Sequence, residues 1–124
     1  GDITTYNPTV LNRVVSKETA ESVVDMLRYN YSKSLPEWYY WDLKNYDIGI
    51  KSGTALIANS TGYSTNINAT FVGFDASSDR TFVMLVRLED PKIPDYDRLA
   101  FYNVRPLWLD IFNATKDIIG VPRK

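Results

Sequence analysis

Four consecutive residues, Lys51-Ser52-Gly53-Thr54, could do chemistry together because they combine a cation, two hydroxyl groups and a glycine. A ligand backbone can approach closely at Gly53, since glycine has no side chain to block it. If the segment is a regular strand, its alternation places Lys51 and Gly53 on one face and Ser52 and Thr54 on the other. The stretch therefore sets a cation beside a backbone that a ligand can approach.

The composition narrows what else the chain could do. It contains no cysteine, which excludes a disulfide frame, thiolate catalysis and a Cys-based zinc site, and no histidine, which excludes a Ser-His-Asp centre and any His-ligated metal. The net charge of −1 gives no excess of positive charge of the kind that nucleic-acid-binding proteins carry. We expect no metal or cofactor, and we interpret six of the acidic residues as lying in solvated turns. These residues are Asp75, Asp79, Glu89, Asp90, Asp95 and Asp97.

The first predicted element is a helix over residues 17–29. Ser16 is a suitable N-cap, Glu18 suits the helix dipole, and apolar residues then recur at helical spacing. Residues 30–45 are predicted to be irregular and rich in aromatic rings, with Pro36 preventing a continuous helix. They form either a loop packed by its own rings or an aromatic wall beside a binding groove.

Three strands are predicted after the first helix. The strand over 46–58 carries Lys51-Ser52-Gly53-Thr54, and turn residues follow it within 59–64. The strands over 67–74 and 81–88 are joined by the short polar turn 75–79, which is the spacing of an antiparallel hairpin. The strand over 81–88 is apolar at almost every position, a pattern typical of strands covered on both faces.

The last predicted element is a helix that begins near Asn103, tolerates Pro106 in its first turn and ends at Gly120. Its apolar stripe consists of Leu107, Ile111, Ala114 and Ile118, with Trp108, Phe112 and Ile119 beside it. So wide an apolar face predicts burial against the sheet. The fold class is therefore α+β: a three-stranded antiparallel sheet flanked by an N-terminal and a C-terminal helix, in one domain.

Several segments together resemble a known family. Lys51-Ser52-Gly53, the KSG motif hereafter, is similar to the KTG motif of penicillin-binding proteins and serine β-lactamases. Phe71-Val72-Gly73-Phe74 and the strand with its exit over 82–92 are similar to two later strands of that family, and 14–27 is similar to its preceding helix. The chain thus resembles the C-terminal part of a class B penicillin-binding transpeptidase domain over residues 8–122. It departs from that pattern at Ile50, usually Gly, and at Leu56, often Gln.

The resemblance implies a role for each residue of the KSG motif and for Thr54. Lys51 would support the electrostatics and proton transfer around a nucleophile. Ser52 and Thr54 would hydrogen-bond the carboxylate of a substrate or β-lactam, and the backbone N–H of Thr54 would supply one arm of an oxyanion hole. Gly53 would let a peptide lie alongside as an added strand. The implied partners are a peptidoglycan stem peptide or a β-lactam, with no cofactor.

The family's nucleophile is the serine of an SxxK motif, and no Ser-x-x-Lys occurs in this chain. Ser64-Thr65-Asn66 matches the family's SxN motif but follows the KSG motif, so we interpret the match as coincidence. Residues 1–124 are therefore expected to be a partial domain, inactive alone. The missing N-terminal part would supply the serine, and the parent would work on the outer face of the bacterial cytoplasmic membrane through an anchor outside this chain.

Two other interpretations stay open. The parent could be a non-catalytic relative, a sensor or structural domain that binds β-lactam or peptide without turnover. The chain could instead be a freestanding α+β interaction module in which the motif is accidental. Because the strand over 82–88 would normally pair with a strand of the missing part, we expect its edge to be exposed and to promote self-association.

Overall fold

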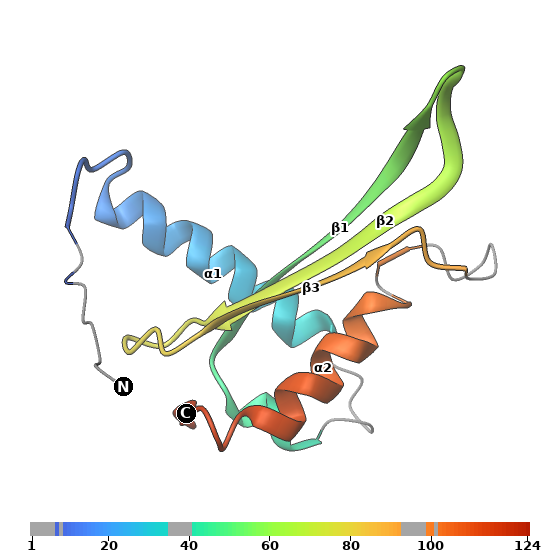
Figure 1. Ribbon diagram of the computed structural model, residues 1–124. Coiled ribbons are helices and arrows are strands. Elements are labelled where there is room, and N and C mark those ends of the chain that lie inside the picture. Colours follow the sequence, from blue (N-terminus) through green and yellow to red (C-terminus); the bar gives the residue numbers. More distant parts are fainter. Residues whose placement is uncertain (1–6, 8, 35–40, 93–98, 101) are drawn as a thin grey trace, which may run out of the picture.

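A computed structural model describes residue 7 and residues 9–34, 41–92, 99–100 and 102–124, except for the side chains of 34 and 41. The elements are α1 (Lys17–Ser34), the 3-10 helix η1 (Trp41–Asn45), β1 (Ile48–Asn59), β2 (Gly62–Asp75), β3 (Val83–Glu89) and α2 (Val104–Thr115). The strands form one antiparallel sheet in the order β1-β2-β3. Helices α1 and α2 lie on opposite sides of it (Figure 1). The predicted α+β class, with three antiparallel strands and a helix at each end, is confirmed.

Helix α2 covers one face of the sheet, as its wide apolar face predicted, through Trp108 and Phe112 beside the predicted stripe rather than through the stripe itself. Its fully buried residues are Val104, Trp108, Leu109 and Phe112. The predicted stripe is wrong, because Leu107 is 39% exposed and Ile118 is 83% exposed beyond the end of the helix at Thr115. The sheet determines which face of α2 is buried. Gly73 leaves room on β2 for the indole of Trp108, whose Nε1 donates to the Met84 carbonyl at 3.0 Å.

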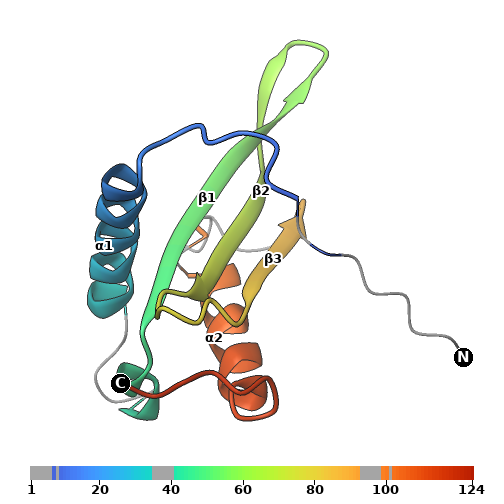
Figure 2. The ribbon, with the colours of Figure 1, turned by 90° about the vertical axis from the view of Figure 1, so that its left-hand side faces the viewer.

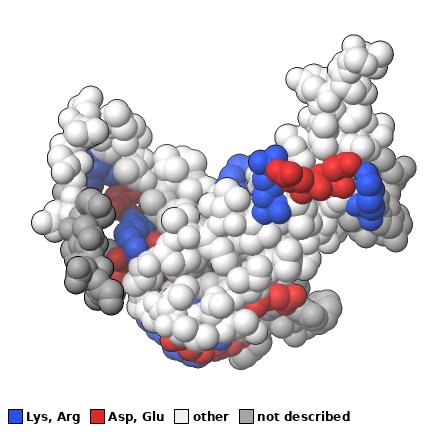
Figure 3. All heavy atoms as spheres, in the orientation of Figure 1, with Lys and Arg blue, Asp and Glu red and all other residues white. Residues whose placement is uncertain are grey.

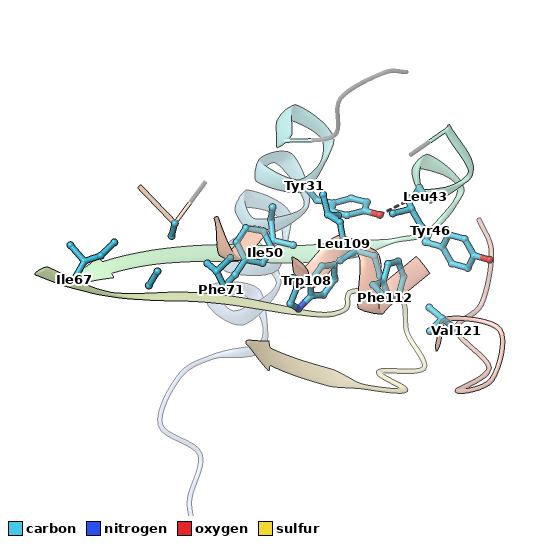
Figure 4. Close-up of a cluster of buried hydrophobic side chains, with 14 residues drawn as sticks. Tyr31, Leu43, Tyr46, Ile50, Ile67, Phe71, Trp108, Leu109, Phe112 and Val121 are labelled. Atoms are coloured by element: carbon cyan, nitrogen blue, oxygen red, sulfur yellow. Dashed lines mark hydrogen bonds between the residues drawn. The ribbon is translucent and has the colours of Figure 1, made fainter. Parts of the chain in front are cut away.

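The core lies between α2 and the sheet and extends toward the C-terminus (Figure 4). The rings of Trp108 and Phe112 stack with centroids 5.2 Å apart, and Phe71 packs against Trp108 at 5.6 Å. Tyr46 meets Phe112 edge-on and forms an isolated bridge with Arg123, so the C-terminal residues close over the start of β1. This packing fixes the end of β1 from which the KSG motif extends.

Helix α1 continues to Ser34, five residues beyond its predicted end. The last turns are held by Tyr31, which is buried and donates to the Leu43 carbonyl at 2.8 Å. Within the predicted irregular segment 30–45, residues 41–45 form η1, while 35–40 and the side chain of Trp41 lie outside the described part of the structure. The buried Tyr31 therefore supports the interpretation of packed rings at that position, and the aromatic wall stays untested for the others.

Arg28 connects α1 to residues at the ends of β1 and β2. The Arg28 guanidinium donates to the Asp47 carboxylate at 3.0 and 3.1 Å, to Asp25 at 2.6 Å, and to the Ala76 carbonyl. Leu27 packs over Gly49, on the face of β1 opposite to α2. Figure 2 shows the result: α1 runs alongside β1, and β3 lies at the far edge of the sheet.

Strands β1 and β2 form a longer hairpin than predicted. Asn59 pairs with Gly62, so the turn is only Ser60-Thr61, and residues expected in the loop up to Ser64 belong to β2. These polar residues are in strand conformation because they pair across the hairpin. Ser64 Oγ donates to the Ile57 carbonyl at 2.8 Å, close to the bulge that shifts the register. The hairpin projects well beyond both helices (Figure 1).

Strand β3 is not covered on both faces within the described residues. Its burial alternates, with Met84, Val86 and Leu88 half-buried on the α2 side. On the other side Val83 is 73% exposed and Leu85 is 62% exposed. The apolar run predicted burial on both faces, and the described residues cover only one of them.

Candidate functional site

The KSG motif occupies the middle of β1, on the edge of the sheet. The β1–β2 register is unbroken from Ile48 to Leu56, so the strand is regular through the motif. β2 pairs with one side of β1, and no strand among the described residues pairs with the other. The outer backbone of β1 is therefore an open strand edge, to which an extended peptide can add.

Alternation divides the four candidate residues between two faces, as predicted. Ser52 pairs with Phe71 and Thr54 with Ala69, both core residues under α2, which places the two hydroxyls on the α2 side. Lys51 and Gly53 lie on the opposite side. A ligand along the open edge would thus have the lysine on one flank and the hydroxyls on the other.

Lys51 is exposed, and its Nζ donates to the Ser52 carbonyl at 2.7 Å. No carboxylate of the described residues pairs with it. Residues 52–74 contain no Asp, Glu, Lys or Arg, and the projecting hairpin is uncharged on the face shown in Figure 3. As far as the described residues show, Lys51 is therefore a cation that an incoming anion could approach without displacing a carboxylate.

The two hydroxyls differ in their partners. Ser52 is exposed, and its Oγ makes no hydrogen bond to the part of the chain that the structure describes. Thr54 is also exposed, yet its Oγ1 accepts the backbone N–H of Ala100 at 3.0 Å. Sequence reasoning missed Ala100, and no local pattern could have revealed a contact between positions so far apart in the chain.

Gly53 has a close neighbour inside the fold. Thr70 is its partner on β2, and the Thr70 Oγ1 donates to the Gly53 carbonyl at 3.3 Å. A Cβ at position 53 would lie 2.6 Å from that Oγ1. The glycine therefore avoids a close contact with the Thr70 hydroxyl across the strand pair. Thr70 was not among the predicted site residues, because its importance depends on the register.

The other sequence features do not join this site. Ser64 of the SxN match is engaged in the hairpin, where its Oγ accepts the Asn66 N–H at 3.2 Å. Asp75 was predicted to lie in a solvated turn but is 1% exposed, and its carboxylate accepts from Ser77 and Thr81. Asp95 and Asp97 lie outside the described residues, and no group of three potential metal ligands occurs among those described.

Among the described residues, the geometry of the KSG motif suits an anionic, extended ligand. No helix among the described residues is long and apolar enough to span a membrane. What the site offers is a cation, two hydroxyls and an open strand edge, which suit a carboxylate-bearing peptide.

The sequence of this chain is similar to those of known proteins. Residues 3–104 match the family described as the penicillin binding protein transpeptidase domain. The chain is 30% identical over 96 residues to the peptidoglycan D,D-transpeptidase FtsI of Buchnera aphidicola subsp. Baizongia pistaciae (strain Bp), a match covering 77% of this chain and 16% of that protein. A crystal structure of penicillin binding protein 2X from Streptococcus thermophilus aligns with a TM-score of 0.49 and 23% identity, over 80% of this chain and 16% of that one.

The chain thus spans about one sixth of the length of these relatives. The family match covers most of its residues, including the whole β1–β2 hairpin and β3. This chain belongs to the penicillin-binding protein transpeptidase family.

Proposed function

We propose that this chain is the C-terminal part of a D,D-transpeptidase domain that cross-links peptidoglycan stem peptides through a serine ester and binds β-lactams. The observation that carries the proposal is the KSG motif on an open strand edge, with Lys51 on one flank and the hydroxyls of Ser52 and Thr54 on the other. An acyl-donor peptide with a terminal carboxylate matches both its shape and its charge.

Each residue of the motif has a role in this proposal. Lys51 supports the charge and proton transfer at the nucleophile, and Ser52 and Thr54 hydrogen-bond the terminal carboxylate. The backbone N–H of Thr54 is one arm of the oxyanion hole, and donors of this kind typically contribute several kcal/mol to transition-state stabilisation. Gly53 has no side chain to block the strand, so the peptide can lie against its backbone.

The chain alone is proposed to be inactive, because the serine nucleophile and its lysine base are absent from its sequence. In the parent protein, the N-terminal part of the domain supplies the serine and the lysine base, and this chain packs against that part. That parent works on the outer face of the cytoplasmic membrane. The two alternatives, a non-catalytic sensor and an accidental motif, differ from this proposal in whether a serine is acylated.

The isolated chain is also proposed to self-associate through β3. The outer edge of β3 pairs with no strand among the described residues, and Val83 and Leu85 expose apolar surface beside it. Open edges with apolar side chains favour pairing with a second chain. A monomer at high concentration in light scattering would contradict this part of the proposal.

Labelling with a fluorescent penicillin tests the main proposal. We expect covalent labelling of a longer protein that includes the upstream part of the domain, and no labelling of the 124-residue chain. The control is the longer protein with Lys51→Ala, which should label more slowly although Lys51 is exposed and its loss should leave the fold intact. An unlabelled longer protein would reject catalysis and favour the sensor interpretation.

A further inference from the structure

The hydroxyl of Thr54 is held by a peptide group from a distant part of the chain. Its Oγ1 accepts the N–H of Ala100 at 3.0 Å, and Ala100 is 1% exposed in the turn before α2. Within the described residues this is the only hydrogen bond of the Thr54 side chain. One lone pair of the hydroxyl oxygen is therefore occupied, and among the described residues its proton has no acceptor.

The peptide group that makes this bond is itself fixed and polarised. Its carbonyl, that of Leu99, accepts the Tyr102 N–H at 2.9 Å and the Asn103 Nδ2–H at 2.9 Å. The Ala100 carbonyl accepts the Arg105 N–H of α2 at 3.0 Å. Hydrogen bonds accepted by a carbonyl strengthen the donor at the other end of the same peptide group. The N–H of Ala100 is therefore a firm anchor for the threonine hydroxyl.

A hydroxyl has one proton to donate and two lone pairs that can accept. With Ala100 donating to one lone pair, the Thr54 hydroxyl can still donate its own proton on the exposed α2 side of β1. We propose that the Ala100 N–H is a positioning group that makes the Thr54 hydroxyl a donor to a ligand carboxylate. This inference rests on the proposed function, and it adds a selection for ligands that present a hydrogen-bond acceptor at this point.

Hydrogen exchange tests the contact itself in the 124-residue chain. Thr54→Val removes the acceptor while keeping a similar shape, so the Ala100 amide should exchange at least about tenfold faster. Thr54→Ser keeps the oxygen and should leave that rate close to the original. The Arg105 amide, which bonds to the Ala100 carbonyl, is the internal control and should not change.

The functional role is tested in the longer protein by comparing acylation by a penicillin with acylation by its methyl ester. Ala100→Pro removes the N–H, and Ala100→Gly is the conservative variant that retains it. We expect Ala100→Pro and Thr54→Val to lower the rate for the carboxylate form about tenfold, while the ester rate changes little. Ala100→Gly should restore the preference for the carboxylate.

The outcomes separate the two proposals. If the unaltered longer protein is not acylated by penicillin, the proposed function fails. If it is acylated and Ala100→Pro keeps the full preference for the carboxylate, the role of Ala100 is overturned while the function stands. Should proline prevent folding, unchanged exchange of the Ala100 amide in Thr54→Val overturns the inference instead.

Discussion

Replacing Gly53 by alanine tests why the KSG motif contains a glycine. The new Cβ would lie 2.6 Å from Thr70 Oγ1, well inside contact distance. Relief by rotating Thr70 breaks its 3.3 Å hydrogen bond to the Gly53 carbonyl. Overpacking of this kind costs about 1–3 kcal/mol, and alanine recovers about 0.4–1 kcal/mol by restricting the unfolded chain. We therefore expect Gly53→Ala to lower the free energy of unfolding by about 1–2 kcal/mol.

A double-mutant cycle isolates the cause. Thr70→Ala alone should cost about 1 kcal/mol through its lost hydrogen bond. Combined with Gly53→Ala it removes the clash, so the double variant should be about 1–2 kcal/mol more stable than the sum of the single changes predicts. Thr70→Val is the matched control, because valine keeps the branched shape and should give no rescue. Urea unfolding followed by tryptophan fluorescence compares the unaltered chain, the three single variants, and Gly53→Ala combined with Thr70→Ala or with Thr70→Val.

Two results would refute this reasoning: a neutral Gly53→Ala, or strict additivity in the cycle. Penicillin labelling of the longer protein then separates packing from ligand approach. A stable Gly53→Ala, Thr70→Ala variant that labels slowly would indicate that the ligand also needs the glycine. Normal labelling would indicate that cross-strand packing is its whole purpose.

Three further predictions follow from the packing of the sheet. Gly73→Ala should destabilise the chain by about 3 kcal/mol, more than Gly53→Ala, because its Cβ would lie 2.2 Å from the rigid, buried ring of Trp108; an equal or smaller loss in urea unfolding would contradict this. Burial raises the pKa of Asp75, but hydrogen bonds from Thr81 and Ser77 outweigh it and hold that pKa below its ordinary value. The stability that Asp75 contributes is therefore present above about pH 4 and is lost as the pH falls through the lowered pKa, so Asp75→Asn should be less stable at neutral pH and lose less on acidification, as urea midpoints across pH 2–7 would reveal. Leu85→Lys should reduce self-association in light scattering without a loss of stability above about 0.5 kcal/mol, since Leu85 is 62% exposed, and undiminished association would show that β3 is not the interface.

Local patterns in the sequence were sufficient for the element types. The period-2 alternation around Lys51 predicted the division of the motif between two faces, and the pairing register of β1 with β2 agrees with it. Asn103 marked the start of α2 and is its N-cap, with its side chain accepting from Val104. The polar turn at 75–79 predicted the β2–β3 hairpin. These features depend on neighbours within a few residues, which a sequence displays directly.

Longer-range packing decided the rest. The sequence could not show which face of α2 is buried, because the answer depends on the space that Gly73 leaves for Trp108 on another element. The extension of α1 depends on the contact of Tyr31 with the carbonyl of Leu43, which belongs to the next element of the chain.

The sequence by itself determined the family, the α+β class and the residues of the KSG motif, since each is written in residue types and short spacings. Only the tertiary structure decided that Thr54 meets the Ala100 amide and that Gly53 faces Thr70. The first contact closes a long loop and the second depends on strand register. Both arise when the core under α2 packs, and no local propensity encodes them.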